Sequence, residues 1–452
     1  MTNFSGKNLN AGSGNPQGRG MDSGCNVDQV AESSAEYLVV QADTRVPVGY
    51  KNTEVGVIPE DWQCKRLGEL GDIVRGGSPR PAGDPKYFNG KFVPWLTVAS
   101  LTNIPESQQR VVTTATMLTE LGSKHSRILE KNTLIISNSG ATLGVAKILD
   151  LKCCANDGVA AIINQKLGDK SFLVHFINTK TKDLHDKVAT GNGQPNLNTD
   201  LIKTISVPFP DEQEQTAIAN ALSDVDALIN ELEKLISKKQ AIKTATMQQL
   251  LTGRTRLPAF ANHPDGTPKT YKQTELGEIP EDWEIHCLGD CVDYLGSGRT
   301  GTKSKGDFPL YGSTGLIGSC EYPEYEGEAI LVARVGANAG RLSYVRGKYG
   351  VSDNTIIVRL NPDCELQFFR YWLISKNLNN LIFGSGQPLI TGTQLRGLSL
   401  SLPNKEEQTA IATILTDMDA DIQALQQRLT KTRHIKQGMM QELLTGKTRL
   451  PI

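Results

Sequence analysis

The chain has 452 residues, 38% of them hydrophobic and 21% charged, and its formal net charge at pH 7 is -1. This is the composition of an ordinary soluble protein with room for two or three domains. No run of about 18 apolar residues could span a membrane, and no secretion signal opens the chain, so we expect a cytoplasmic protein without a membrane partner. The near-zero net charge means that any basic surface for nucleic acid must be local.

The eight cysteines contain no CxxC pair, and the six histidines are scattered. A structural zinc site needs such a spacing, so we expect no metal site and reduced thiols in this chain.

Residues 1–47 are rich in Gly, Asn and Ser and lack a hydrophobic period, which predicts a disordered N-terminal tail. Residues 48–208 form the first expected globular domain. Apolar β-branched runs predict strands at 133–137 and 159–163, and residues 172–178 predict a short helix, so the domain is mixed α/β.

Residues 209–258 are predicted to form a long helical spacer. Asp211 and Glu214 give a capping-box pattern at its start, and Gly253 is a terminating glycine. Apolar residues recur in alternating steps of four and three, the a/d seam of a coiled coil, at Ile218, Leu222, Val225, Ile229, Leu232 and Ile236. The seam slips phase after its last residue, which leaves a break or stutter open there.

The second half of the chain repeats this organisation. A linker at 259–273 leads to a second α/β domain at 274–402, in which strands are predicted at 329–333 and 354–359 and a helix at 367–375. A distal helical spacer follows at 403–452, with the same seam at Ile411, Leu415, Met418, Ile422, Leu425 and Leu429.

The repeat is close in the helices and loose in the domains. Positions 211–258 and 404–451 align without a gap, and 25 of these 48 positions are identical. The segment 50–62 recurs at 271–283, with its tryptophan expected as a core anchor. Because each seam needs a partner and the chain must return between the copies, we expect an antiparallel pair of long coiled-coil helices. This pair would separate two mixed α/β domains in a pseudo-twofold internal repeat.

Polar loops that follow apolar strands supply the candidate nucleic-acid contacts. Arg and Lys suit phosphates and guanine, Asn suits adenine, and Ser and Thr suit either. The candidates are Arg75, Ser78, Arg80, Ser137, Asn138 and Thr142 in the first domain, and Ser297, Arg299, Thr302, Lys303, Lys305, Arg334 and Asn338 in the second. The same residue types are typical of solvated loops and turns, so composition leaves both interpretations open.

The order of these parts resembles the specificity (S) subunit of type I restriction-modification enzymes, the HsdS family. The resemblance covers residues 48–452 and rests on three pairs of motifs. These are the IPxxW segments ending at Trp62 and Trp283, the EQxxIA helix starts at Gln215 and Gln408, and the QxLLTG helix ends at Gly253 and Gly446. It implies two target recognition domains that each bind half of a bipartite double-stranded DNA sequence.

The resemblance also implies partners. Two modification (methyltransferase) subunits would dock on the helices, and restriction subunits, which translocate and cleave DNA, would join the complex. S-adenosylmethionine, ATP and Mg are then expected on the partner subunits, with no cofactor in this chain. The helix positions expected to bind partners are Gln215, Ile218, Leu222, Gln408, Ile411 and Leu415.

A catalytic role would need motifs that the sequence lacks. It contains no Asn/Asp-Pro-Pro-aromatic loop for an extruded base, no nuclease-type carboxylate pair with a lysine, and no GxxxxGK[ST] phosphate loop. We therefore expect a non-catalytic subunit. Two alternatives stay open: a self-contained DNA methyltransferase with an unrecognised active site, and a coiled-coil scaffold without a DNA role.

Overall fold

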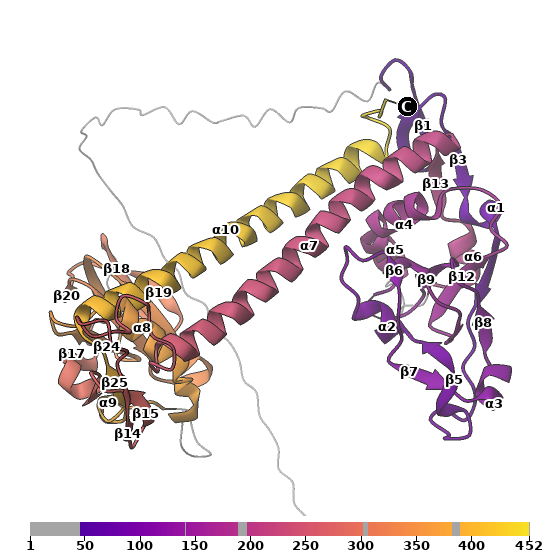
Figure 1. The fold of residues 1–452 in the computed structure, drawn as a ribbon. Coiled ribbons are helices and arrows are strands. Elements are labelled where there is room, and N and C mark those ends of the chain that lie inside the picture. Colours follow the sequence, from indigo (N-terminus) through magenta and orange to yellow (C-terminus); the bar gives the residue numbers. More distant parts are fainter. Residues whose placement is uncertain (1–45, 141, 189–196, 302–305, 382–388, 452) are drawn as a thin grey trace, which may run out of the picture. The chain divides into compact units, whose positions relative to one another are not determined.

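The computed structural model describes residues 46–140, 142–188, 197–301, 306–381 and 389–451. Nearly all of the tail predicted at 1–47 lies outside these residues, as do three candidate site residues, Thr302, Lys303 and Lys305. The chain from Pro47 onward forms one unit by its internal contacts, and Figure 1 labels its helices and strands. In this unit no described helix is long and apolar enough to cross a membrane, and the seven described cysteines are free.

The first domain consists of two sheets and a set of short helices. One sheet has the strand order β4-β12-β9-β10-β6, the other has the order β7-β5-β11-β8, and β3 pairs with β13. The strands are β1 (Tyr50–Thr53), β2 (Gly56–Pro59), β3 (Gln63–Arg66), β4 (Asp72–Arg75), β5 (Phe88–Leu96), β6 (Arg110–Val111), β7 (Thr116–Leu118), β8 (Arg127–Leu129), β9 (Leu134–Ser137), β10 (Ala146–Leu149), β11 (Cys153–Ala155), β12 (Val159–Ile163) and β13 (Ser206–Phe209). The helices are α1 (Leu67–Leu70), α2 (Val98–Thr102), α3 (Glu120–Lys124), α4 (Lys170–Thr179), α5 (Thr181–Val188) and α6 (Thr199–Lys203).

The second domain repeats this plan. Its sheets have the orders β17-β24-β21-β22 and β19-β18-β23-β20, and β16 pairs with β25. The strands are β14 (Tyr271–Thr274), β15 (Gly277–Pro280), β16 (Glu284–Cys287), β17 (Val292–Ser297), β18 (Phe308–Gly312), β19 (Gly315–Cys320), β20 (Tyr325–Glu326), β21 (Ala329–Ala333), β22 (Leu342–Val345), β23 (Lys348–Val351), β24 (Thr355–Leu360) and β25 (Ser399–Leu402). The helices are η1 (Leu288–Cys291), η2 (Gly336–Asn338), α8 (Leu366–Ser375), η3 (Leu378–Leu381) and α9 (Gly392–Arg396).

The central strands β9 and β21 are buried along their whole length because both faces of their sheet are covered. In β9, Leu134 and Ile136 join the core that contains α4, whereas Ile135 joins the core shared with the other sheet. In β21, Ile330 and Leu331 divide between two cores in the same way. Continuous apolar runs are typical of strands buried on both faces, and the strands and short helices predicted from these runs are confirmed.

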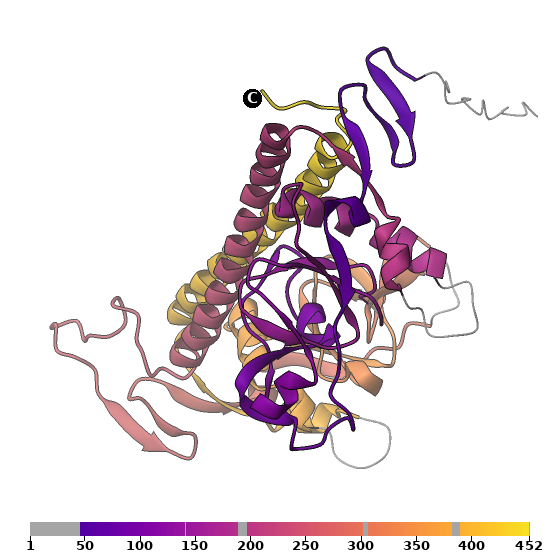
Figure 2. The same cartoon turned by 90° about the vertical axis from the view of Figure 1, so that its right-hand side faces the viewer.

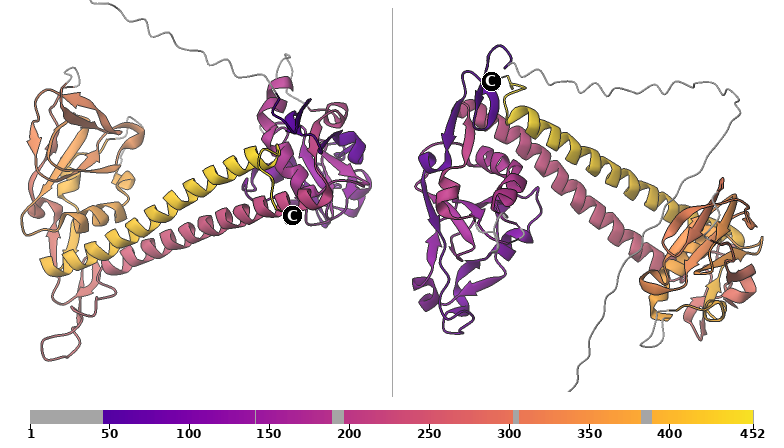
Figure 3. Two further views of the ribbon diagram at one scale, coloured as in Figure 1. Left: turned by 90° about the horizontal axis from the view of Figure 1, so that it is seen from above. Right: turned by 180° about the vertical axis from the view of Figure 1, so that it is seen from behind.

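Two long helices, α7 (Glu212–Leu250) and α10 (Lys405–Leu443), lie side by side (Figures 2 and 3). They run antiparallel, because Arg433 pairs with Glu233 and Lys243 with Asp419. The seam between them is formed by Val225, Ile229, Leu232, Ile236, Ile422, Leu425 and Leu429. Both helices continue without interruption past the point where the apolar pattern slips, so no break occurs there.

Ion pairs replace apolar contacts where the seam stops. Lys243 Nζ lies 2.5 Å from Asp419 Oδ1, and the equivalent Lys436 Nζ lies 2.7 Å from Asp226 Oδ1. Ile242 is 46% exposed, so it does not continue the seam. The phase slip in the sequence therefore marks a change from apolar to charged contacts rather than a bend.

Each domain core contains the start of one long helix and the end of the other. Ile218 and Leu222 of α7 pack with Leu443 of α10 in the first domain. Ile411 of α10 packs with Met247 of α7 in the second domain. The two halves of the chain are therefore joined through shared cores at both ends of the helix pair.

The helix starts differ from the predicted capping boxes in one respect. Asp211 Oδ1 accepts a hydrogen bond from the backbone N–H of Glu214 at 2.8 Å, and Asn404 caps α10 in the same way. The carboxylate of Glu214 does not return to the cap, because it accepts a hydrogen bond from Trp62 Nε1 at 2.9 Å. The predicted N-caps are thus confirmed. The second hydrogen bond of each predicted capping box, from the N-cap backbone N–H to the glutamate, is wrong.

Candidate nucleic-acid interface

Three predicted residues of the first domain gather around Asp157, which the sequence analysis did not single out. Asp157 lies in the loop between β11 and β12. Ser78 Oγ donates to Asp157 Oδ1 at 2.6 Å, and Arg80 Nη2 lies 3.7 Å from Oδ2. Arg75 Nε donates to the backbone oxygen of Asp157 at 2.5 Å. Two loops that are far apart in the sequence are thus joined at one polar cluster.

The hydroxyl of Ser78 is the main reason that the pKa of Asp157 lies below its usual value. The carboxylate is therefore charged at neutral pH, and its side chain is 42% exposed. An exposed carboxylate accepts hydrogen bonds from cytosine N4, while the neighbouring arginines suit guanine or phosphate. The sequence signal for Asp157 was its position two residues before the buried strand β12, whereas Asn138 was chosen because it follows a buried strand.

Asn138 and Ser137 support this cluster from the end of β9. Asn138 is 1% exposed, and its Nδ2 donates to the backbone oxygen of Asp157 at 3.2 Å. Its Oδ1 has no hydrogen-bond partner among the described residues. Ser137 is fully buried and donates to the backbone oxygen of Ser139 at 3.2 Å, and Thr142 lies beside it. Because Ser137 is fully buried, the structure does not support the predicted contact between Ser137 and DNA.

The second domain places Arg334 and Ser297 together. Arg334 Nη1 donates to Ser297 Oγ at 3.2 Å, which holds the guanidinium at the ends of β21 and β17. Arg299 is exposed two residues beyond Ser297, and Asn338 lies half-buried in η2. The structure thus brings two of the predicted residues into direct contact and leaves Arg299 facing solvent.

Asn138 and Arg334 occupy matching backbone positions in the two domains. The backbone N–H of Asn138 donates to Gly158 at 3.0 Å, and that of Arg334 donates to Asn354 at 3.0 Å. The carbonyl of each residue accepts one further bond, from Leu197 at 2.8 Å or from Ile390 at 2.9 Å. The same scaffold position therefore carries an amide in one domain and a guanidinium in the other.

The helix residues predicted to bind partners are used inside this chain. Gln215 Nε2 donates to the backbone oxygen of Pro210 at 2.8 Å, and its Oε1 accepts from Asp169 N at 2.8 Å. Gln408 makes the equivalent bonds to Pro403 and Glu365. All six predicted positions are at most 2% exposed, namely Gln215, Ile218, Leu222, Gln408, Ile411 and Leu415. A partner that docks on α7 and α10 would have to contact other residues.

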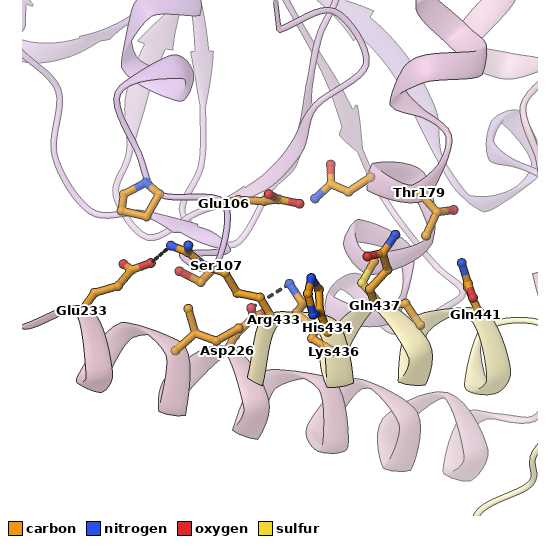
Figure 4. A pocket seen from close by; sticks show the side chains of 14 residues that line it. Glu106, Ser107, Thr179, Asp226, Glu233, Arg433, His434, Lys436, Gln437 and Gln441 are labelled. Carbon is orange, nitrogen blue, oxygen red and sulfur yellow. Dashed lines mark hydrogen bonds and ion pairs between the residues drawn. The ribbon is translucent and has the colours of Figure 1, made fainter. Parts of the chain in front are cut away.

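A polar groove of about 780 Å³ lies between the first domain and the helix pair (Figure 4). Its charged side chains are largely matched: Arg433 pairs with Glu233 at 2.7 Å, and Lys436 pairs with Asp226. None of the candidate DNA-contact residues lines it. Among the described residues no group of His, Cys, Asp or Glu could hold a metal ion. The groove thus offers ion pairs, of which Lys436–Asp226 is buried and Arg433–Glu233 is partly exposed, rather than a reactive constellation.

Comparison with known proteins matches residues 59–244 and 280–432 to the type I restriction modification DNA specificity domain. The type I restriction enzyme MjaVIII specificity subunit of Methanocaldococcus jannaschii is 25% identical over 424 residues, covering 87% of this chain and 94% of the relative. The EcoprrI specificity subunit of Escherichia coli is 22% identical over 365 residues, covering 78% and 86%.

A solved structure supports the same fold. The S subunit of a type I restriction-modification system from M. genitalium superposes with a TM-score of 0.56 at 17% identity, covering 84% of this chain and 96% of that one. At this identity the superposition establishes the fold alone: a mixed α/β chain.

Proposed function

The chain belongs to the type I restriction-modification DNA specificity family, and from this membership we propose that it is the sequence-recognition subunit of a type I restriction-modification complex. It binds a bipartite double-stranded DNA target in the cytoplasm and has no catalytic activity of its own. Modification and restriction subunits supply S-adenosylmethionine, ATP and Mg.

The observation that carries this proposal is the matched pair Asn138 and Arg334. Equivalent backbone hydrogen bonds hold both residues at strand ends, but their side chains differ. Arg334 suits guanine in the major groove, whereas the buried Asn138 holds the exposed Asp157, which suits cytosine. A duplicated scaffold with different side chains at one position is what two half-sites of different sequence require.

We further propose that the chain divides at the predicted boundaries. The target recognition domains are 48–208 and 274–402, and 259–273 is the linker. Residues 209–258 and 403–452 are the two spacers, which pair as a coiled coil in a pseudo-twofold repeat. The ion pairs Lys243–Asp419 and Lys436–Asp226 support this symmetry, because each residue has its counterpart 193 positions away.

We propose that two modification subunits dock on the spacers, and an apolar stripe on α7 supports one of these contacts. Leu228, Leu235 and Ile242 recur at steps of seven and are 40%, 40% and 46% exposed. A third helix packs on such a stripe in a coiled-coil assembly. Substituting all three residues with Ser should weaken assembly with a modification subunit, as measured by analytical ultracentrifugation. Two of the equivalent places on α10 carry the charged residues Asp421 and Arg428, so the docking is asymmetric.

The test of the proposal is methylation of DNA by the assembled complex. Chain and modification subunits together should methylate adenine at one bipartite sequence in a genome, and neither should do so alone. Transfer of a methyl group by the purified chain alone would instead establish the self-contained methyltransferase. An assembled complex that methylates without sequence preference would overturn the recognition role.

A further inference from the structure

The hairpin formed by β18 and β19 exposes two apolar side chains at its tip. Leu316 is 65% exposed and Ile317 is 41% exposed. Both lie in β19 just after Gly315, the first residue beyond the turn at Ser313 and Thr314 that joins the two strands. Exposed apolar groups on a strand end are costly in water unless a ligand covers them, so this pair is a candidate for contact with the target.

The hairpin holds its tip in a fixed position. Gly312 pairs with Gly315 and Tyr311 with Leu316, with a bulge before Tyr311. Gly315 has a φ of +100°, a left-handed conformation that disfavours other residues. Tyr311 also anchors the hairpin to the core, because its ring packs edge-on against the buried Tyr349. Leu316 is therefore presented on a rigid base rather than on a loose loop.

The tip adjoins the polar candidates of the second domain. A side chain at Gly312 would meet both Ile317 and Ser352 Oγ, so these two groups lie close together. The backbone N–H of Ser352 donates to Tyr311, and Asn354 accepts from Arg334 at 3.0 Å. Through the loop 352–354, the apolar tip and the guanidinium of Arg334 belong to one end of the domain.

Side chains that form hydrogen bonds cannot recognise the one apolar feature of the bases in the major groove. The 5-methyl group of thymine is the apolar mark in the major groove, and it is recognised by apolar contact. Resting on the proposed function, we propose that Leu316 and Ile317 recognise thymine methyl groups in the half-site bound by the second domain. Arg334 then contacts a base of the same half-site through hydrogen bonds.

Among its described residues, the first domain has no tight hairpin equivalent to that of β18 and β19, because the corresponding antiparallel strands β5 and β7 are far apart in the sequence. The strand of the first domain that corresponds to β18 is β5, because β5 pairs in parallel with β11 just as β18 pairs in parallel with β23. After β5 the chain enters α2, where Val98 packs against the loop at Gly158 instead of facing solvent. The contact by the β18–β19 hairpin should therefore be confined to one half-site, and the Leu316 and Ile317 variants separate it from any contact by Phe92 of β5, which is 60% exposed.

The experiment replaces each thymine of the target, one at a time, with deoxyuridine, which lacks only the methyl group. Binding of the assembled complex is measured for the wild-type chain and for Leu316→Ala and Ile317→Ala. In one half-site, loss of a methyl group should weaken wild-type binding about fourfold, the value of one buried methyl or methylene group. In the variant that has lost the leucine or isoleucine contacting that thymine, the same replacement should change binding by less than about twofold, because no side chain then covers the methyl group.

The matched control is Leu276→Ala, another exposed leucine of the second half, 41% exposed in the hairpin of β14 and β15. It should keep the full sensitivity to deoxyuridine. The inference is overturned if no thymine is sensitive, if sensitivity is equal in the wild-type chain and both tip variants, or if the half-site of the second domain contains no thymine. A wild-type complex that binds no specific sequence would overturn the proposed function itself, a result distinct from these.

Discussion

Arg449, at the end of the chain, is hydrogen-bonded to Glu214 in the first turn of α7. Arg449 Nη2 donates to Glu214 Oε2 at 2.7 Å, and Nε donates to Oε1. The same guanidinium pairs with Asp61 at 2.9 Å and stacks on Trp62. In the other half, Arg256 pairs with Glu407 and Asp282 at 2.8 Å and stacks on Trp283. The tail of each half therefore closes the domain of the other.

This clamp explains why three short motifs are repeated together. The IPEDW segment supplies the aspartate and tryptophan, the EQ helix start supplies the glutamate, and the TRLP tail supplies the arginine. The tyrosines at the start of the repeated segments add a bond each, since Tyr50 Oη donates to Gly446 O and Tyr271 Oη to Gly253 O. The motifs meet in space only because the helices run antiparallel.

Loss of a clamp arginine should destabilise the chain, and the two sites should differ. Arg256 is 6% exposed and Glu407 is 2% exposed, so Arg256→Ala leaves a buried carboxylate without its cation, at a cost of about 3–5 kcal/mol. Arg449 is 40% exposed, so water partly replaces it and Arg449→Ala should cost about 1–3 kcal/mol. Urea unfolding followed by tryptophan fluorescence measures both, because a tryptophan lies in each clamp.

Arg254→Ala and Lys447→Ala are matched controls, since both residues are exposed and lie two positions before the clamp arginines. They should change stability by less than about 0.5 kcal/mol. Equal losses for Arg256→Ala and Arg254→Ala would show that the clamp contributes no more than the loss of any surface charge.

Lys147 should make stability depend on pH in the alkaline range. It is 2% exposed, and its Nζ donates to the backbone oxygens of Pro105 and Gln108 at 3.0 and 2.5 Å. Burial lowers its pKa to about 8, against an opposing effect of Asp226. Between about pH 8 and the ordinary pKa of lysine, Lys147 is protonated in the unfolded chain but not in the folded chain. The free energy of unfolding therefore rises with pH over this range, by on the order of 3 kcal/mol.

The check is the difference in unfolding free energy between the wild-type chain and Lys147→Met from pH 7 to pH 10. That difference should be constant below about pH 8 and then increase in favour of the wild-type chain. Other titrating groups are common to both proteins and cancel. A flat difference over this range would mean that Lys147 keeps an ordinary pKa in the folded chain, and a falling difference would mean that folding raises its pKa.

Arg299 and Arg334 should affect DNA binding differently. Arg299 is exposed, and a phosphate contact by it would account for about 0.9 of the slope of log K against log salt. Arg299→Ala should lower the slope by this amount for all sequences. Arg334 is held by Ser297, so Arg334→Ala should reduce discrimination at one base pair by about 1–3 kcal/mol with little change of slope.

Salt titrations on cognate DNA and on its single-base variants separate the two effects. Arg346→Ala is the control, because this arginine is 78% exposed, lies 3.6 Å from Glu328 and follows the end of β22 that pairs with the start of β21, opposite to the end that carries Arg334. If Arg299→Ala altered base preference and left the slope unchanged, the assignment of phosphate contact to Arg299 would be wrong.

The sequence predicted the helices and strands better than the side-chain contacts between them. The spacing of apolar residues shows which face of one helix or strand is buried, but not which other element covers that face. Ile229 and Leu232 were correctly placed on a seam between the helices, whereas Ile218 and Leu222 pack in the core of the first domain. Trp62 and Trp283 are core anchors as expected, each 1% exposed. The seam did not reveal that Gln215 bonds inside the domain, because a hydrogen bond to Asp169 depends on tertiary structure. Asp157 was missed for the same reason, since its partners Ser78 and Arg80 lie about 80 positions away.

The helix pair should set the gap between the half-sites. An insertion in α7 alone would shift its register against α10, because ion pairs link the helices along their length. Seven residues inserted after Ser237 and seven after Ala424, which lies opposite in the antiparallel pair, keep the a/d seam in phase. The pair then lengthens by about 10 Å, which corresponds to about three base pairs of DNA.

The doubly extended chain should methylate the same two half-sites with a gap longer by about three base pairs, as read from the methylated positions in a genome. The single insertion after Ser237 is the matched control, and it should lower stability and assembly because the seam beyond it falls out of register. An active complex with an unchanged gap would show that the helices do not measure the distance. A change in the half-site bases themselves would place recognition in the helices rather than in the domains that carry Asn138 and Arg334.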